Sequence, residues 1–170
     1  MDTFAYKALQ LAVRAHDGQY RRGVRVPYIT HPIAVSAMAT QNMKSNRVAA
    51  LCFVHDVLED TEVTYADLCA ELDVQLADDV VWLTNYKVDQ FKNRAARKAA
   101  DAKRLAKAPW HVQTVKCWDM YHNLSDMRIE GSDFLSRYTD DCAMILSHLE
   151  LCDLHARGKL LGLIQEIRST

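Results

Sequence analysis

Residues 51–61, with the sequence LCFVHDVLEDT, constrain the fold more than any other stretch of the chain. Most of them are apolar, which predicts a buried helix. His55 and Asp56 nevertheless lie inside this run, and Glu59 and Asp60 follow one turn later. Residues three and four apart share a helix face, so these four side chains would form one polar patch. Because burying unpaired carboxylates costs several kcal/mol, the patch indicates a bound divalent cation with further ligands elsewhere in the chain.

The remainder of the chain has few residues that break helices, with five Gly and three Pro in 170 residues. Apolar residues recur at helical spacing and no alternating strand pattern is visible. We therefore predict an all-α fold that forms a single domain over residues 1–170. The expected helices cover residues 3–17, 30–43, 47–59, 65–72, 73–83, 93–107, 111–127, 134–156 and 160–167, with Asn46 and Thr64 as N-caps and Asp73 at the start of the helix over residues 73–83.

Charge and composition exclude several classes of partner. The formal net charge of −1 argues against a domain that neutralises many nucleic-acid phosphates, but it permits a local basic pocket for one small phosphorylated ligand. Since no apolar run approaches the ~18–20 residues of a membrane span and no leader pattern is visible, we expect neither a membrane nor a signal peptide. The five Cys, an odd number without a CxxC pair, predict buried thiols in a cytoplasmic protein. The pattern makes no prediction of oligomeric state.

Basic residues gather in two further places. Arg21 and Arg22 belong to a loop that suits an anion or an aromatic base, although a solvated charged loop has the same composition. Arg94, Arg97 and Lys98 share one helix face, which could grip phosphates or simply face solvent.

Two other polar positions resemble the central one. His31 precedes Pro32 at the expected start of a helix, where a lone His is more often a cap or a surface residue. Asp119 lies in a mostly apolar helix and shares one side with Lys116 and Asn123, so a bound cation is again a possible explanation.

A separate zinc site is conceivable in the C-terminal third. His148, Cys152 and His155 are spaced i, i+4 and i+7 and could share a helix face. We favour packing instead, because Cys is commonly buried as a small hydrophobe and no fourth ligand is evident.

Five stretches together resemble a known family. They are His16-Asp-Gly-Gln19, Arg21-Arg22, Pro27-Tyr-Ile-Thr-His-Pro32, His55-Asp-Val-Leu-Glu-Asp-Thr61 and Lys116-Cys-Trp-Asp-Met-Tyr-His-Asn123. The ordered set resembles the HD-domain phosphohydrolases. More narrowly, it resembles the alarmone hydrolases, which comprise the hydrolase half of Rel/SpoT-type enzymes and the free-standing small (Mesh-type) hydrolases. The short chain is similar to the free-standing type.

The resemblance implies an HD-fold helical bundle with one divalent ion held by His31, His55, Asp56 and Asp119. The family usually uses Mn²⁺, and two imidazoles with two carboxylates also suit Fe²⁺ or Zn²⁺. Glu59 and Asp60 would be the catalytic pair that orients a water molecule and takes its proton. The implied reaction releases pyrophosphate from the 3′ position of guanosine tetra- or pentaphosphate and leaves GDP or GTP.

The resemblance also implies a set of nucleotide contacts, namely Arg21, Arg22, Arg94, Arg97, Lys98, Asn123 and Arg137. The chain departs from the family beside one ligand, because Trp118 and Met120 stand where Ala and Arg are usual. The small-molecule substrate therefore has alternatives, such as the 2′-phosphate of NADPH or a deoxynucleoside triphosphate. A nucleotide-binding sensor without turnover is a further alternative, and the intact Glu59-Asp60 pair argues against it.

Overall fold

The computed structural model describes residues 3–22, 25–130 and 134–169. Within these ranges every regular element is a helix, and the only extended pairing is an isolated bridge between Tyr20 and Pro27. The prediction of an all-α fold is confirmed. The chain divides into two compact units, residues 1–84 and 85–170. The single domain expected over residues 1–170 therefore stays a prediction.

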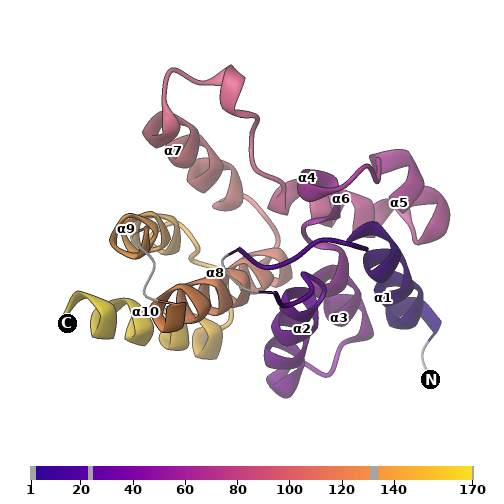
Figure 1. The fold of residues 1–170 in the computed structure, drawn as a ribbon, viewed down its shortest axis with the longest axis horizontal. Helices are drawn as coiled ribbons and strands as arrows, with labels where there is room; N and C mark the ends of the chain where they lie inside the picture. Colours follow the sequence, from indigo (N-terminus) through magenta and orange to yellow (C-terminus); the bar gives the residue numbers. More distant parts are fainter. Residues whose placement is uncertain (1–2, 23–24, 131–133, 170) are drawn as a thin grey trace. The chain divides into compact units, whose positions relative to one another are not determined.

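The first unit is built around one central helix. Its elements are α1 (Thr3–Ala15), α2 (Thr30–Asn42), α3 (Asn46–Val54), α4 (Val57–Asp60), α5 (Tyr65–Glu71) and α6 (Val74–Leu83) (Figure 1). Helix α3 packs against α1, α2 and α6, and α5 packs against α6. Five apolar residues of α3 are buried, including Leu51, Cys52 and Val54. The apolar part of residues 51–61, which the sequence predicted to be buried, therefore lies in the core of the first unit.

Side-chain caps start three helices of the first unit, α3, α5 and α6. Thr64 caps α5 as predicted, in a reciprocal capping box with Asp67. Asp73, predicted only as the start of a helix, is the N-cap of α6 and accepts the backbone N–H of Leu76. The cap expected at Asn46 is wrong by one residue, because Ser45 accepts the N–H of Val48 instead.

The central helix is shorter than expected. We predicted one helix over residues 47–59, but α3 ends at Val54 and α4 begins at Val57, with His55 and Asp56 in the turn between them. The ring Nδ1 of His55 lies 2.8 Å from the carbonyl oxygen of Cys52. In a continuous helix that carbonyl would accept the N–H of Asp56, so the imidazole is bound to a backbone acceptor at the break.

The second unit consists of a short 3₁₀ turn, η1 (Val88–Gln90), and four helices, α7 (Arg94–Leu105), α8 (Trp110–Glu130), α9 (Leu135–Leu146) and α10 (Leu154–Arg168). Helix α8 packs against both α9 and α10, and α7 packs against α9. Asn93 caps α7 through the N–H of Ala96. The long helix α8 therefore forms the centre of this unit.

A turn separates α9 and α10, where we predicted one helix over residues 134–156 and another over residues 160–167. Two buried polar residues of α8 hold this turn. The side chain of Gln113 accepts the N–H of Leu151, and that of Thr114 accepts the N–H of Asp153, both at 2.9 Å. Asp153 then caps α10 through the N–H of Ala156. These long-range hydrogen bonds hold a turn where the apolar spacing of residues 134–156 predicts a continuous helix.

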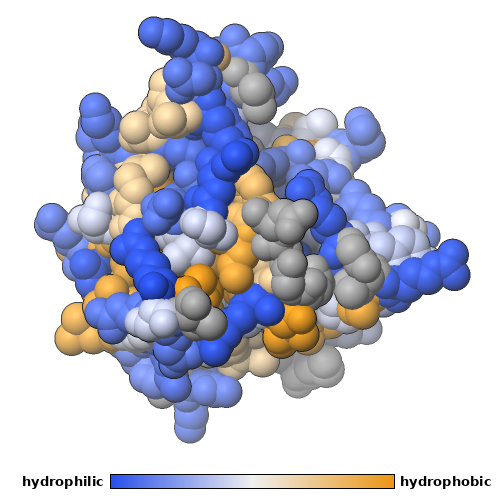
Figure 2. Space-filling view, turned by 60° about the vertical axis from the view of Figure 1, so that its left-hand side comes forward, coloured by the Kyte–Doolittle hydropathy of each residue, from blue (hydrophilic) through white to orange (hydrophobic). Residues whose placement is uncertain are grey.

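The structure also bears on two sequence expectations, which concern membrane spans and the thiols. In the part of the chain that the structure describes, no helix has both the length and the hydropathy of a membrane span. Hydrophilic residues cover most of the face drawn in Figure 2, with apolar residues between them. All five Cys are free thiols, and four of them are buried. This arrangement fits the absence of a disulfide framework.

Candidate metal centre

His31 lies in the first turn of α2 and is completely buried. The turn before it is tied to the preceding loop by two bonds, in which Thr30 Oγ1 donates to the Pro27 carbonyl at 2.8 Å and the His31 N–H donates to the Tyr28 carbonyl at 2.9 Å. The residue is therefore a fixed interior group. Of the two roles open for a lone His at a helix start, the surface one is excluded.

His55 and Asp56 supply two donor groups from consecutive positions. Side chains of adjacent helical residues normally diverge by about 100° around the axis. The turn between α3 and α4 brings these two together, because the Nε2 atom of His55 lies 3.0 Å from Oδ2 of Asp56. The Cys52 carbonyl can only accept a hydrogen bond, so Nδ1 of His55 carries the proton and donates to it. In the neutral ring, Nε2 then has the lone pair that a metal needs.

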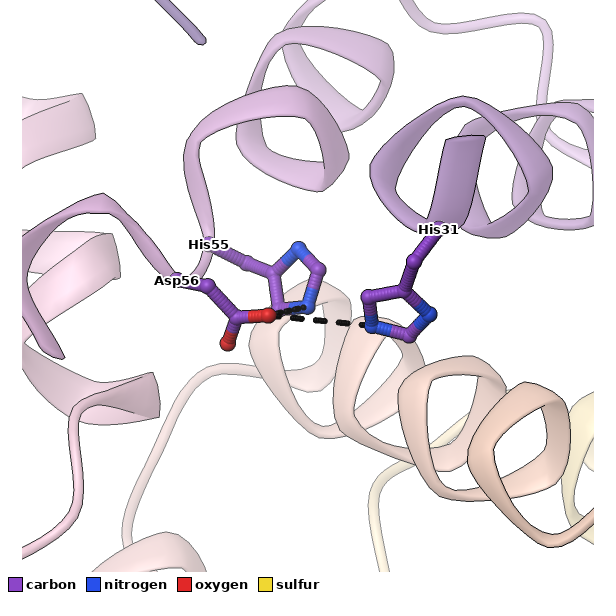
Figure 3. Close-up of side chains that lie close together, drawn as sticks. All are labelled: His31, His55 and Asp56. Atoms are coloured by element: carbon purple, nitrogen blue, oxygen red, sulfur yellow. Dashed lines mark ion pairs between the residues drawn. The ribbon is translucent and has the colours of Figure 1, made fainter. Parts of the chain in front are cut away.

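The three side chains converge from α2 and from the turn after α3, as Figure 3 shows. The Nε2 atom of His31 lies 3.7 Å from the same Asp56 Oδ2, and the two imidazole rings are 5.1 Å apart between centroids. One ligand atom from each residue lies within 4.8 Å of the other two. Among the described residues this is the only group of three or more His, Cys, Asp or Glu side chains that could hold a metal ion.

The cluster fits a divalent cation. Donor atoms that bind one ion at about 2.1 Å lie roughly 3 to 4 Å apart, which is the range of the two distances to Asp56. Two imidazole nitrogens and a carboxylate form a mixed set that suits transition metals. The predicted convergence of His31, His55 and Asp56 is therefore present within the first unit.

Glu59 and Asp60 form the C-terminal half of α4, and both reach solvent. Loss of surrounding water, together with the neighbouring charges of Asp56 and Glu59, raises the pKa of Asp60 to about 6, against a lowering hydrogen bond from Tyr28. A carboxylate with a pKa near neutrality is a better proton acceptor than an ordinary one. The acidic pair therefore lies directly after the cluster, as expected.

Tyr28 is a member of the site that the sequence prediction left without a role. Its hydroxyl lies 2.5 Å from Oδ2 of Asp56 and 3.3 Å from Oδ2 of Asp60. Its ring makes an edge contact with His31, at 5.8 Å between centroids. A usable signal existed, since Tyr28 precedes His31 by three residues in one of the family-like stretches, and this spacing favours contact in a helical turn.

His16 and Gln19 are two further neighbours that were not predicted. His16 is buried, and this burial lowers its pKa. Its Nδ1 lies 2.8 Å from Oε1 of Gln19, while Gln19 Nε2 donates to the Asp60 carbonyl at 2.8 Å. The loop after α1 is thereby attached to the acidic turn.

Asp119 lies in α8, in the second unit, and is 4% exposed. Its Oδ2 pairs with Lys116 Nζ at 2.7 Å, and its Oδ1 accepts the amide of Asn123 at 2.6 Å. The prediction that these three residues share one side of a helix is confirmed. The proposed roles of Asp119 as a ligand and Asn123 as a nucleoside contact stay predictions.

The predicted basic face of α7 makes contacts inside the second unit. Arg94 forms an ion pair with Asp141, Arg97 donates to the Tyr86 carbonyl at 3.3 Å, and Lys98 donates to Asn85 at 3.3 Å. These bonds join α7 to α9 and to the loop before α7. Their predicted contact with phosphates stays a prediction.

The other predicted nucleotide contacts lie in both units. The guanidinium of Arg21 is 5.7 Å from the ring centroid of Tyr28, so it belongs to the surroundings of the cluster. Arg22 is an exposed residue of the same loop. In the second unit, the exposed Arg137 lies 5.6 Å from the ring centroid of Phe134.

The spacing that suggested a zinc site does not produce a shared helix face. His148 and Cys152 lie in the turn between α9 and α10, while His155 belongs to α10. The Sγ of Cys152 donates to the Leu149 carbonyl, and His155 packs against Trp118. This agrees with the packing role that we favoured.

No family model matches the chain. Among curated proteins it is similar to the guanosine-3′,5′-bis(diphosphate) 3′-pyrophosphohydrolases of Borreliella burgdorferi, with 29% identity over 140 residues, and of Haemophilus influenzae, with 30% identity over 125 residues. These alignments cover 81% and 72% of this chain but 21% and 18% of the relatives. Over these alignments the chain is a homologue of the two pyrophosphohydrolases. It spans about a fifth of the length of these curated relatives.

The fold agrees with this relationship. A solved structure described as a metazoan ortholog of SpoT that hydrolyzes ppGpp superposes with a TM-score of 0.87 at 20% identity, and the match covers 98% of this chain and 97% of the other. A Listeria monocytogenes protein matches with a TM-score of 0.71 over 85% of this chain. These likenesses show that the chain has the same helical fold as the two solved structures.

Proposed function

We propose that the chain is a metal-dependent hydrolase that removes pyrophosphate from the 3′ position of guanosine 3′,5′-bis(diphosphate). One observation carries the proposal: His31, His55 and Asp56 converge on one point, and Glu59 and Asp60 follow within one turn. Two curated relatives bear the name of this activity, and the metazoan ortholog of SpoT is described as a protein that hydrolyzes ppGpp.

The cofactor is a divalent cation, for which we propose Mn²⁺, with Fe²⁺ and Zn²⁺ as alternatives that the same donors accept. When bound, such an ion supplies Lewis-acid stabilisation of a phosphoryl oxygen and lowers the pKa of water. His31, His55 and Asp56 would hold it. We propose Asp119 as the fourth ligand, because a buried carboxylate already oriented by Lys116 and Asn123 is suited to that task.

Glu59 and Asp60 would accept the proton of the attacking water. Asp60, with a pKa raised to about 6, can accept a proton from water near neutral pH, and Glu59 lies beside it in the same turn. Repulsion between the carboxylates favours protonation of one of them. We assign both to orienting the attacking water and removing its proton.

Basic side chains would bind the nucleotide, a small molecule with several phosphates. Arg21 adjoins the cluster through Tyr28, because its guanidinium lies over that ring. A guanidinium can stack on a purine or make paired bonds to phosphate. We retain Arg22, Arg94, Arg97, Lys98, Asn123 and Arg137 as proposed contacts, and a cytoplasmic location as the expected setting.

The direct test supplies the protein with Mn²⁺ and, in separate reactions, guanosine tetraphosphate, NADPH and a deoxynucleoside triphosphate. We expect pyrophosphate and GDP from the tetraphosphate. Inorganic phosphate from NADPH, or release from the deoxynucleotide alone, would replace the proposed substrate. Binding of the tetraphosphate without any product would establish a sensor instead.

A matched pair of variants tests the acidic turn. We expect Glu59→Gln to bind Mn²⁺ normally and to lose about a hundredfold to ten-thousandfold in turnover, because a positioned proton acceptor contributes that much. Glu62→Gln changes an exposed carboxylate just after α4 and should leave turnover unchanged. Normal turnover by Glu59→Gln would refute the role given to Glu59.

A further inference from the structure

The hydroxyl of Tyr28 lies between the two carboxylates that the proposed chemistry uses. It is 2.5 Å from Asp56 Oδ2, the same oxygen that lies 3.0 Å from His55 Nε2 and 3.7 Å from His31 Nε2. It is also 3.3 Å from Oδ2 of Asp60. A phenol carries one proton, so the shorter distance marks Asp56 as the acceptor.

We propose that Tyr28 is a positioning residue of this centre, whose hydroxyl donates to and fixes the imidazole-facing oxygen of Asp56, 3.3 Å from Oδ2 of Asp60. The roles of the two carboxylates rest on the proposed function. A carboxylate ligand that receives a hydrogen bond has fewer orientations to lose when it binds an ion, which is why such partners raise metal affinity.

Contacts at both ends of the side chain hold the hydroxyl in place. The ring packs 4.7 Å from that of His16 and meets the edge of His31, measured between centroids. The Tyr28 N–H donates to the Gln19 carbonyl at 2.9 Å, and the Tyr28 carbonyl accepts the N–H of His31. Because the backbone and the ring are both fixed, little entropy is lost when the hydroxyl orients Asp56.

The same residue joins the arginine loop, residues 19–22, to the acidic turn. Arg21 lies over the Tyr28 ring, and Gln19 in that loop donates to the Asp60 carbonyl. The ring therefore supports the loop, whereas the hydroxyl contacts the carboxylates. Two substitutions can separate these contributions, since phenylalanine keeps the ring and leucine removes both.

The first experiment measures Mn²⁺ binding by electron paramagnetic resonance of the free ion, without any substrate. We expect Tyr28→Phe to weaken the Kd for Mn²⁺ about tenfold to a hundredfold, the usual cost of losing a group that orients a ligand. At saturating Mn²⁺, it should lower kcat for guanosine tetraphosphate while KM stays within about twofold, because the ring and the arginine loop remain. Tyr28→Leu should also raise KM.

The chain contains a matched control. Tyr65 donates to Oδ1 of Asp78 at 2.7 Å in the same unit, and both residues are exposed. Tyr65→Phe therefore removes an equivalent bond away from the cluster and should leave the Kd for Mn²⁺ unchanged. A Tyr28→Phe protein that folds and binds Mn²⁺ like the wild type would overturn the proposal, as would an equal loss in Tyr65→Phe.

A second measurement decides the question if Tyr28→Phe fails to fold. 3-Fluorotyrosine incorporated at position 28 should change its ¹⁹F resonance on addition of Zn²⁺ more than the same label at position 65. Equal responses would overturn the proposal. If Tyr28→Phe weakens Mn²⁺ binding but the wild type leaves guanosine tetraphosphate intact, the positioning role stands and the proposed function fails.

Discussion

The buried or partly buried carboxylates Asp56, in the first unit, and Asp119 and Asp141, in the second, have different neighbours. In the first, Asp56 lies against two imidazoles and a phenol, and none of these groups carries a fixed positive charge. In the second, Asp119 pairs with Lys116, and Asp141 pairs with Arg94. The second arrangement neutralises charge with the chain's own cations and stabilises the fold. The first gathers negative charge around nitrogen donors, which favours a cation from solution.

The largest expected effect contrasts Asp56→Asn with Asp141→Asn. Asp56→Asn should weaken Mn²⁺ binding by more than about a hundredfold, because a lost ligand costs more than a lost outer partner. In chelator, the melting temperature of this variant should be unchanged or higher. The substitution removes the repulsion between the charges of Asp56 and Asp60, which raises the pKa of Asp60 in the wild type. Asp141→Asn should instead lower the melting temperature by about 2–4 °C, because Arg94 loses its partner.

Calorimetry with and without chelator checks both variants. The contrast between the two units would be broken if metal-free Asp56→Asn melted at a lower temperature than Asp141→Asn. That result would mean that the first cluster stabilises the fold by itself.

An intermediate effect is expected at Lys116, which pairs with the buried Asp119. Lys116→Met should lower the free energy of unfolding of the metal-free protein by about 2–4 kcal/mol, because it leaves a buried carboxylate without its cation. If Asp119 is the fourth ligand, Mn²⁺ should stabilise this variant more than it stabilises the wild type. Urea denaturation measures both quantities.

The exposed Lys159 of α10 provides the control for this substitution, and Lys159→Met should unfold like the wild type. An equal gain from Mn²⁺ in Lys116→Met and wild type would count against Asp119 as a ligand. Unchanged stability in metal-free Lys116→Met would show that the pair contributes little.

The smallest effect is expected at Asp73, which forms a neutralised pair with Arg47 in the first unit. This pair can be compared with the metal-binding cluster of the same unit. Hydrogen bonds from Arg47, at 2.8 and 2.9 Å, lower the pKa of Asp73. The folded pKa lies below the unfolded one, so this pair contributes stability above about pH 4 and loses it as the pH falls through the folded pKa. Because the pair is partly exposed, we expect less than about 1 kcal/mol from it.

Asp73→Asn keeps a good N-cap for α6 while removing the charge. Urea unfolding should show a small loss at pH 7 that disappears near pH 2. A loss of equal size at both pH values would mean that the cap, and not the charge, is responsible.

The sequence was sufficient for features that depend on local spacing. The all-α fold follows from the apolar period and the scarcity of Gly and Pro, and the cap at Thr64 follows from side-chain chemistry. The face shared by Lys116, Asp119 and Asn123 follows from helix geometry. His31 was assigned through the family resemblance, because its position alone favoured a surface role.

Features that depend on contacts distant in sequence were missed. The break after Val54 involves residues that favour a helix, and the bond from His55 to the Cys52 carbonyl is invisible to propensity. The turn after α9 requires Gln113 and Thr114 of another helix. Tyr28 was overlooked because its partners Asp56 and Asp60 lie 28 and 32 residues away.

The break between α3 and α4 has a consequence for how this chain tolerates changes in length. Two donor groups come from neighbouring positions in one irregular turn, and their convergence depends on that turn alone. An inserted or deleted residue there would rotate both side chains away in one event. Natural variants should therefore retain both His55 and Asp56 in the cluster or lose both. The loop before α2 can vary in length, provided that its last turn still places His31 in the cluster.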